Sequence, residues 1–167
     1  MREIHDIHDV TKYQSLVDVN AECEVFLFTS PASMPIGFAQ HPWFVVNKKG
    51  TLSRWEVLHW QHITDIELGH VHVDFLPPFL GMRVFIHHER FRWSAKLLGK
   101  AEGEIARTLT ACIEESKLTY PHSHHYKLSG PNSNTYAQWV LNQVPEFEAR
   151  LPWNSFGKKH FVPDESF

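Results

Sequence analysis

Apolar and polar positions alternate along much of the first half of the chain, whereas apolar positions recur at helical spacing in the second half. Alternation is typical of strands, whose side chains point to two faces in turn. It predicts strands at residues 23–30, 36–46, 51–60, 65–75 and 82–93. The sequence Asn-Lys-Lys-Gly at 47–50 predicts a hairpin turn, in which glycine supplies a positive φ. Residues 1–20 lack a clear period and predict a short helix or an irregular arm.

Two later segments, residues 101–116 and 135–144, have the spacing of amphipathic helices. The apolar stripes are Ile105, Leu109, Cys112 and Ile113 in the first, and Tyr136, Trp139, Val140 and Val144 in the second. Strands followed by helices predict an α+β fold, an antiparallel sheet of about four to six strands with helices packed on it. The length of 167 residues fits a single domain, 1–167.

Composition excludes several classes of function. The net charge is −3 without a basic block, which argues against binding to nucleic acid. No apolar run approaches the ~20 residues of a membrane span, and the first residues do not resemble a signal peptide, so we expect a cytoplasmic protein. Two cysteines, Cys23 and Cys112, are too few for a disulfide framework, and we expect both to pack as small apolar residues. The sequence indicates no cofactor.

Asn132-Ser133-Asn134-Thr135 stands at the start of the second predicted helix. Asn and Ser are preferred N-caps, worth ~1 kcal/mol, and on local sequence alone the cap is the favoured interpretation of Ser133. The alternative is a nucleophile, because the free N–H groups at a helix start favour an anion or oxyanion nearby.

A second candidate pair is His41 and Glu56, on the two strands of the predicted hairpin. If Lys48 and Lys49 are the turn residues, His41 lies directly opposite Glu56, close enough for the carboxylate to fix the imidazole tautomer. A glycine bulge would shift the pairing by one residue and place His41 opposite Val57. Taken alone, His41 is better explained as a half-buried strand histidine bonded to the backbone.

Histidine is unusually frequent, with 13 in the chain. His70 and His72 would lie on one face of a strand, a spacing found among metal ligands, and Asp65, Glu67 and Asp74 are nearby. A further cluster is His122, His124 and His125. No zinc-like spacing recurs, so a metal site is the weakest of the three hypotheses, and we assign no metal ligand.

The segment from Tyr120-Pro121 to His160 is similar to a bacterial family known as domain of unknown function 3750. The resemblance rests on the GPNSNT motif at 130–135, the Pro145-Glu146 step, Leu151-Pro152 and the Gly157-Lys158 pair. Upstream, residues 40–60 are similar to the family's His-x-Trp strand and the strand that follows it. The likeness covers residues 22–160, leaving 1–20 as an arm.

A more distant resemblance is to circularly permuted NlpC/P60 peptidases of the lecithin:retinol acyltransferase type, which implies a papain-like fold. These proteins have a histidine strand first and a cysteine at a helix start later. Here His41-Pro42-Trp43 takes the histidine strand, and Ser133 takes the place of the cysteine. The resemblance implies that Ser133 is the nucleophile, His41 the base and Glu56 the group that orients it.

The implied substrate contacts are Asn132 or Asn134, as a polarising amide, and Trp43. A serine cannot be ionised in advance as a cysteine can, so it needs a base within hydrogen-bond reach. The expected function is therefore hydrolysis or transfer at an amide, ester or thioester bond. The alternative is a binding module that keeps the fold and groove without the reaction, for a peptide, a lipid or a cell-wall fragment.

Overall fold

The computed structural model describes residues 6–59 and 70–160. Its core is a five-stranded sheet in the order β4-β3-β2-β1-β5, in which every neighbouring pair is antiparallel. The strands are β1 (Glu24–Pro31), β2 (Gln40–Lys48), β3 (Thr51–Val57), β4 (Val71–Val73) and β5 (Lys96–Glu102). The helices are α1 (Asp6–Gln14), α2 (Gly103–Thr119) and α3 (Ser133–Gln143). The α+β prediction with an antiparallel sheet is confirmed.

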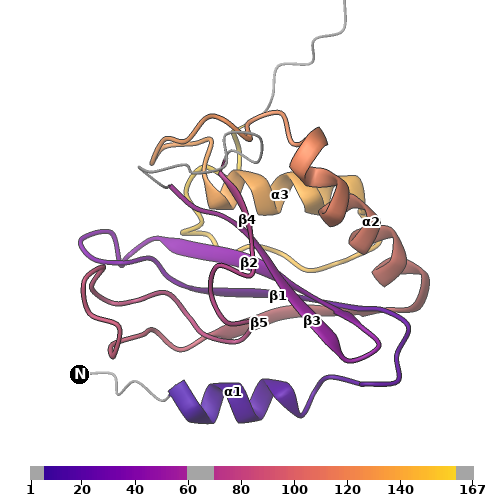
Figure 1. Cartoon of the computed structure of the whole chain (residues 1–167). Helices are drawn as coiled ribbons and strands as arrows, with labels where there is room; N and C mark the ends of the chain where they lie inside the picture. The colour runs from indigo at the N-terminus through magenta and orange to yellow at the C-terminus, as the bar shows by residue number, and fades with distance from the viewer. Residues whose placement is uncertain (1–5, 60–69, 161–167) are drawn as a thin grey trace, which may run out of the picture.

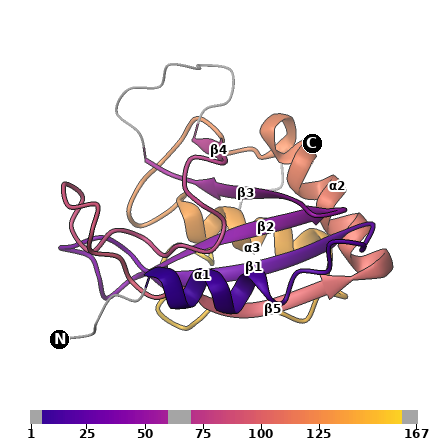
Figure 2. The same cartoon turned by 60° about the horizontal axis from the view of Figure 1, so that its bottom comes forward.

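The helices lie on both sides of this sheet (Figures 1 and 2). α2 and α3 cover one face, where the larger apolar core joins alternate residues of the strands, such as Phe44, to helix residues such as Tyr136. α1 lies on the other face, where Tyr13 packs edge-on against Phe28 in a smaller cluster that includes Trp43. Among the described residues, no helix is long and apolar enough to cross a membrane.

The prediction of a strand at 82–93 is wrong. This segment folds back on itself in a loop, with one isolated bridge between Arg83 and Arg92, and its apolar side chains Phe85, Ile86 and Phe91 are exposed. The fifth strand is β5 instead, an edge strand whose sequence KLLGKAE has little alternation to predict it. Of the predicted strand at 65–75, Val71–Val73 form β4, and residues 65–69 lie outside the described residues.

The β2–β3 hairpin differs from both predicted registers. Lys48 pairs with Thr51, so the turn residues are Lys49 and Gly50, both with positive φ. This is the geometry of a two-residue hairpin turn with left-handed residues at both positions. Relative to the first prediction the pairing is displaced by two residues. Because strand side chains alternate with a period of two, that displacement keeps the same side chains on the same face.

Candidate active site

His41 and Glu56 are in contact, as the sequence suggested, although they are diagonal rather than direct neighbours across the hairpin. The distance from His41 Nε2 to Glu56 Oε2 is 2.7 Å. Both side chains are buried, with exposed fractions of 6% and 1%. The displaced register keeps them on one face and leaves a diagonal separation that the long glutamate side chain spans.

Arg54 completes this network and was not predicted from the sequence. The guanidinium donates from Nε to Glu56 Oε1 at 2.7 Å and from Nη2 to Oε2 at 2.9 Å. Its Nη1 donates to the carbonyls of Pro77 and Leu80, and the group stacks 4.1 Å from the Trp43 ring centroid. A fully buried arginine needs such partners on every side. The sequence did contain a signal for this ion pair: Arg54 and Glu56 carry opposite charges at alternate positions of an apolar strand.

The charge on Glu56 determines which ring nitrogen of His41 donates to it. Burial alone would raise the pKa of Glu56, but the Arg54 charge and the hydrogen bond from His41 outweigh it and lower this pKa to about 2. An ionised carboxylate can only accept, so His41 Nε2 carries the hydrogen of this bond. In the neutral imidazole, Nδ1 is then an acceptor for a proton or a donor group.

His41 also lines an apolar pocket of about 380 Å³ at the end of the sheet. The walls come from residues 32–36, from residues 75–86 and from Tyr126 and Leu128, which precede α3. Apolar lining residues are Met34, Ile36, Leu58, Leu76, Met82 and Ile86. This size and lining, with a few polar groups, are typical of small-molecule sites. This pocket could not be predicted from the sequence, because its walls are loops that meet only in the fold.

Trp43 does not lie where it could contact a substrate. Its side chain is completely buried, and its indole N–H donates to the carbonyl of Pro78 at 2.9 Å. The ring contacts the Arg54 guanidinium, and its centroid lies 6.3 Å from that of the His41 ring. Trp43 therefore packs against the network of His41, Glu56 and Arg54 and supports it from within the core.

At the start of α3, the N-cap is Asn132 and not Ser133. The Asn132 side chain accepts from the N–H groups of Asn134 and Thr135, and Thr135 Oγ1 accepts from the Asn132 N–H in a capping box. Ser133 is the first helical residue, and none of the described hydrogen bonds involves its Oγ. Interpreting Ser133 itself as the cap is therefore wrong, and its hydroxyl is not used for capping.

Both asparagine amides are used to hold the fold. Asn132 Nδ2 donates to the carbonyls of Leu128 and Phe156, and Asn134 Nδ2 donates to those of Gln40 and Phe156. An amide nitrogen has two hydrogens, so neither residue has one left for a substrate. Gly157, with a φ of +91°, packs so closely that a Cβ would lie 2.6 Å from Asn132.

The backbone segments that carry Ser133 and His41 lie next to each other, but no described contact joins the two side chains. The bond from Asn134 to the Gln40 carbonyl brings the start of α3 to the residue before His41. The His41 ring, however, stacks on Trp43, whereas α3 packs through Tyr136 against Phe44, on the opposite face of β2. None of the described hydrogen bonds or ring contacts joins Ser133 to His41.

Several of the other described histidines form ring contacts. His59 and His70 lie with ring centroids 5.8 Å apart, and each contacts Tyr126. His72 lies directly opposite Glu56 on β4, and burial lowers the pKa of both His70 and His72. Within residues 6–59 and 70–160, no group of three or more histidine, cysteine or acidic side chains is placed to hold a metal ion. Asp65 and Glu67 lie outside the described residues.

Both cysteines are free thiols. Cys23 Sγ lies in the core, 2.7 Å from Thr110 Oγ1, and Cys112 is partly buried. Burial, with a smaller contribution from Glu115, raises the pKa of Cys112 to about 11. A thiol with so high a pKa is almost entirely protonated at neutral pH, so Cys112 is a poor nucleophile.

The sequence was compared with protein families, curated proteins and solved structures. The model of the family described as "Protein of unknown function (DUF3750)" matches residues 22–160. The chain belongs to the DUF3750 family. The match covers all five strands together with α2 and α3, and so includes His41, Glu56 and the GPNSNT motif of this DUF3750 chain. No curated protein and no solved structure matches it significantly.

Proposed function

We propose that this DUF3750 protein hydrolyses or transfers an acyl group at an amide, ester or thioester bond. His41 is the general base, Glu56 orients it and Ser133 is the nucleophile. The observation that carries the proposal is the bond between His41 Nε2 and ionised Glu56, which leaves Nδ1 as the basic nitrogen. A buried carboxylate that fixes an imidazole tautomer is the arrangement used in serine acyl transfer.

In this reaction, Ser133 Oγ attacks the carbonyl carbon while its proton passes to His41 Nδ1. His41 then returns the proton to the leaving group, and water or another acceptor releases the acyl group in a second step. The apolar pocket beside His41 would hold the acyl or aromatic part of the substrate. The steps require Ser133 Oγ to come within hydrogen-bond reach of His41 Nδ1.

Two features of α3 support the assignment of Ser133. Because Asn132 is the cap, the Ser133 hydroxyl is available for chemistry. The cap also occupies the N–H groups of Asn134 and Thr135 but not that of Ser133, which stands at the positive end of the helix and can stabilise an oxyanion. The same end of the helix is tied to the backbone next to His41.

The second candidate is a binding module that uses the same pocket without a reaction. It is favoured by the alternation of β2, which directs the His41 ring to the face opposite α3. In this case His41 Nδ1 accepts a hydrogen bond from a hydroxyl or amide group of the ligand, and its apolar body fills the pocket.

The test is turnover of p-nitrophenyl esters of increasing acyl length, together with labelling by a serine-reactive fluorophosphonate. We expect Ser133→Ala and His41→Gln each to reduce turnover about 100-fold or more and to abolish labelling. His125→Gln, at an exposed histidine, is the matched control and should retain full activity. If Ser133→Ala turns over esters as the wild type does, the acyl-transfer proposal is excluded. If neither the wild type nor Ser133→Ala turns over esters, but the two bind a fluorescent fatty acid equally well, the binding module is supported instead.

A further inference from the structure

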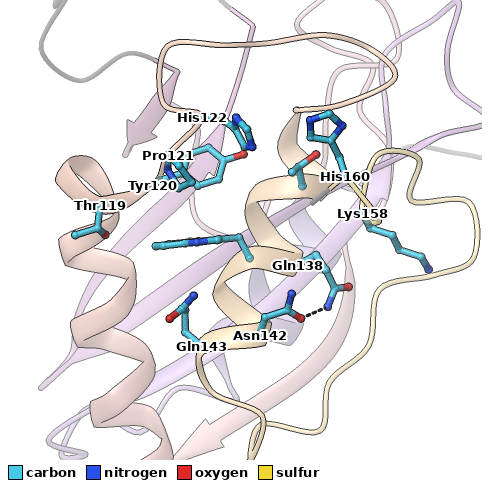
Figure 3. Close-up of a pocket in the computed structure, with 11 residues that line it drawn as sticks. Thr119, Tyr120, Pro121, His122, Gln138, Asn142, Gln143, Lys158 and His160 are labelled. Carbon is cyan, nitrogen blue, oxygen red and sulfur yellow. Dashed lines mark hydrogen bonds between the residues drawn. The ribbon is translucent and has the colours of Figure 1, made fainter. Parts of the chain in front are cut away.

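A second pocket, of about 320 Å³, lies beside α3 (Figure 3). This helix packs on the face of β2 opposite the His41 ring. Its walls are the end of α2 with the residues that follow it, one side of α3, and residues 158 and 160. The rings of Tyr120, His122 and His160 gather at one end of it, with Gln138, Asn142 and Gln143 along the helix (Figure 3). None of these residues belongs to the proposed acyl-transfer site.

Two buried polar atoms at this end have no hydrogen-bond partner among the described residues, Tyr120 Oη and His122 Nε2. Tyr120 is only 2% exposed, and its hydroxyl end points toward His122 (Figure 3). Burial raises the pKa of Tyr120, so the hydroxyl remains a donor. Burial also lowers the pKa of His122, assisted by His160 and His125, so this imidazole is neutral and offers one acceptor nitrogen. Buried polar groups are normally paired, so this pair calls for a partner that can both donate and accept.

The remaining lining selects for a neutral ligand. Among the residues that line the pocket there is no carboxylate, and the one ammonium group, of Lys158, already donates to the carbonyls of Leu151 and Pro152. In Figure 3 the Lys158 side chain extends away from the three rings. A charged ligand would therefore find no free counter-charge on these side chains apart from His160.

The pocket combines amide groups with aromatic faces. Gln138 donates to Asn142 Oδ1, which leaves Gln138 Oε1 and Asn142 Nδ2 as a neighbouring acceptor and donor, and Gln143 adds another amide. The partly buried Trp139 ring adds an aromatic face beside them, and Tyr120 packs against this ring edge-on, with ring centroids 5.4 Å apart at 62°. Amides match the donor and acceptor pairs of adjacent hydroxyl groups, and an aromatic face packs against the C–H face of a saturated ring.

We propose that this pocket is a saccharide-binding site, in which a sugar ring packs on the Trp139 ring. One sugar hydroxyl accepts from Tyr120 Oη and donates to His122 Nε2, and others bond to the amides along α3. The site is independent of the acyl-transfer proposal, because the two share no residue.

The first experiment is an NMR titration of the full chain with glucose, galactose, mannose, N-acetylglucosamine, maltose and chitobiose. We expect at least one sugar to shift the Trp139 indole resonance saturably. Tetrahydropyran, which has the ring without hydroxyls, and inorganic phosphate should cause no such shift. If no sugar produces a saturable shift, or if tetrahydropyran or phosphate produces the same shift, the proposal is overturned.

The second experiment compares Tyr120→Phe with Tyr126→Phe, a matched removal of a hydroxyl in the other pocket. We expect Tyr120→Phe to weaken sugar binding about tenfold or more, because it removes a donor to the ligand. It should not lower the melting temperature of the sugar-free protein, because that hydroxyl has no partner within the described chain. Tyr126→Phe should bind sugar as the wild type does. Unchanged binding by Tyr120→Phe, or a clear loss of stability without sugar, would refute the assignment.

Discussion

Two buried polar clusters lie at the same end of β2, and they are built in opposite ways. The His41 cluster is ionic, with Glu56 between Arg54 and His41. The cluster at the start of α3 is neutral, and the side chains of Asn132 and Asn134 bind backbone groups of three segments.

The difference between the two clusters bears on what each contributes to stability. Neutral amides that bind carbonyls hold segments together at little electrostatic cost, because each group simply replaces water. Ionic groups in a core cost free energy to desolvate, and their net contribution to stability is often small. Stability alone therefore does not explain why Arg54 and Glu56 are completely buried, and under the proposed function they orient His41. The side-chain nitrogens of both asparagines, by contrast, are fully used in holding the fold.

Of the predicted changes in the free energy of unfolding, we expect that of Glu56→Gln to be the largest. This change leaves the Arg54 guanidinium buried without a counter-charge, and removing one partner of a buried ion pair typically costs about 3–5 kcal/mol. Urea denaturation of the wild type and the variant measures the loss in the free energy of unfolding. The double variant Arg54→Met, Glu56→Gln should recover part of it, since no unpaired charge is left. A loss below ~1 kcal/mol in the single variant would show that the pair is not ionised.

The next effect is on the pH dependence of stability. The pKa of Glu56 is lowered from 4.5 to about 2 in the fold, so its contribution is complete above about pH 4.5 and is lost as the pH falls through 2. A difference of this size corresponds to about 3 kcal/mol. Unfolding free energies measured between pH 5 and about 2 should fall more steeply for the wild type than for Glu56→Gln, which lacks the titrating group. Parallel curves would contradict the lowered pKa.

The ionic cluster could be predicted in part from the sequence. The pairing of His41 with Glu56 could be anticipated, because a register error of two residues keeps both on one face. Arg54 was missed, because its partners at Pro77 and Leu80 come from a distant loop. In the neutral cluster the motif was recognised but the cap was placed on the wrong residue, since Asn and Ser are almost equally good caps. Local propensity could not decide between them, whereas the bonds from Asn132 to the distant Phe156 carbonyl and to Leu128, which hold its side chain at the cap, do.

The smallest expected changes in the free energy of unfolding distinguish two neighbouring residues of the neutral cluster, Asn132 and Ser133. Asn132→Ala removes the cap of α3 and the bonds to Leu128 and Phe156, and should lower the free energy of unfolding by about 2 kcal/mol. Ser133→Ala is the matched control, and should change it by less than ~0.5 kcal/mol because no described hydrogen bond uses Ser133 Oγ. Equal losses from the two variants would mean that the serine is structural. A loss confined to Asn132→Ala makes Ser133→Ala a clean probe of catalysis, in which any loss of turnover is due to chemistry and not to unfolding.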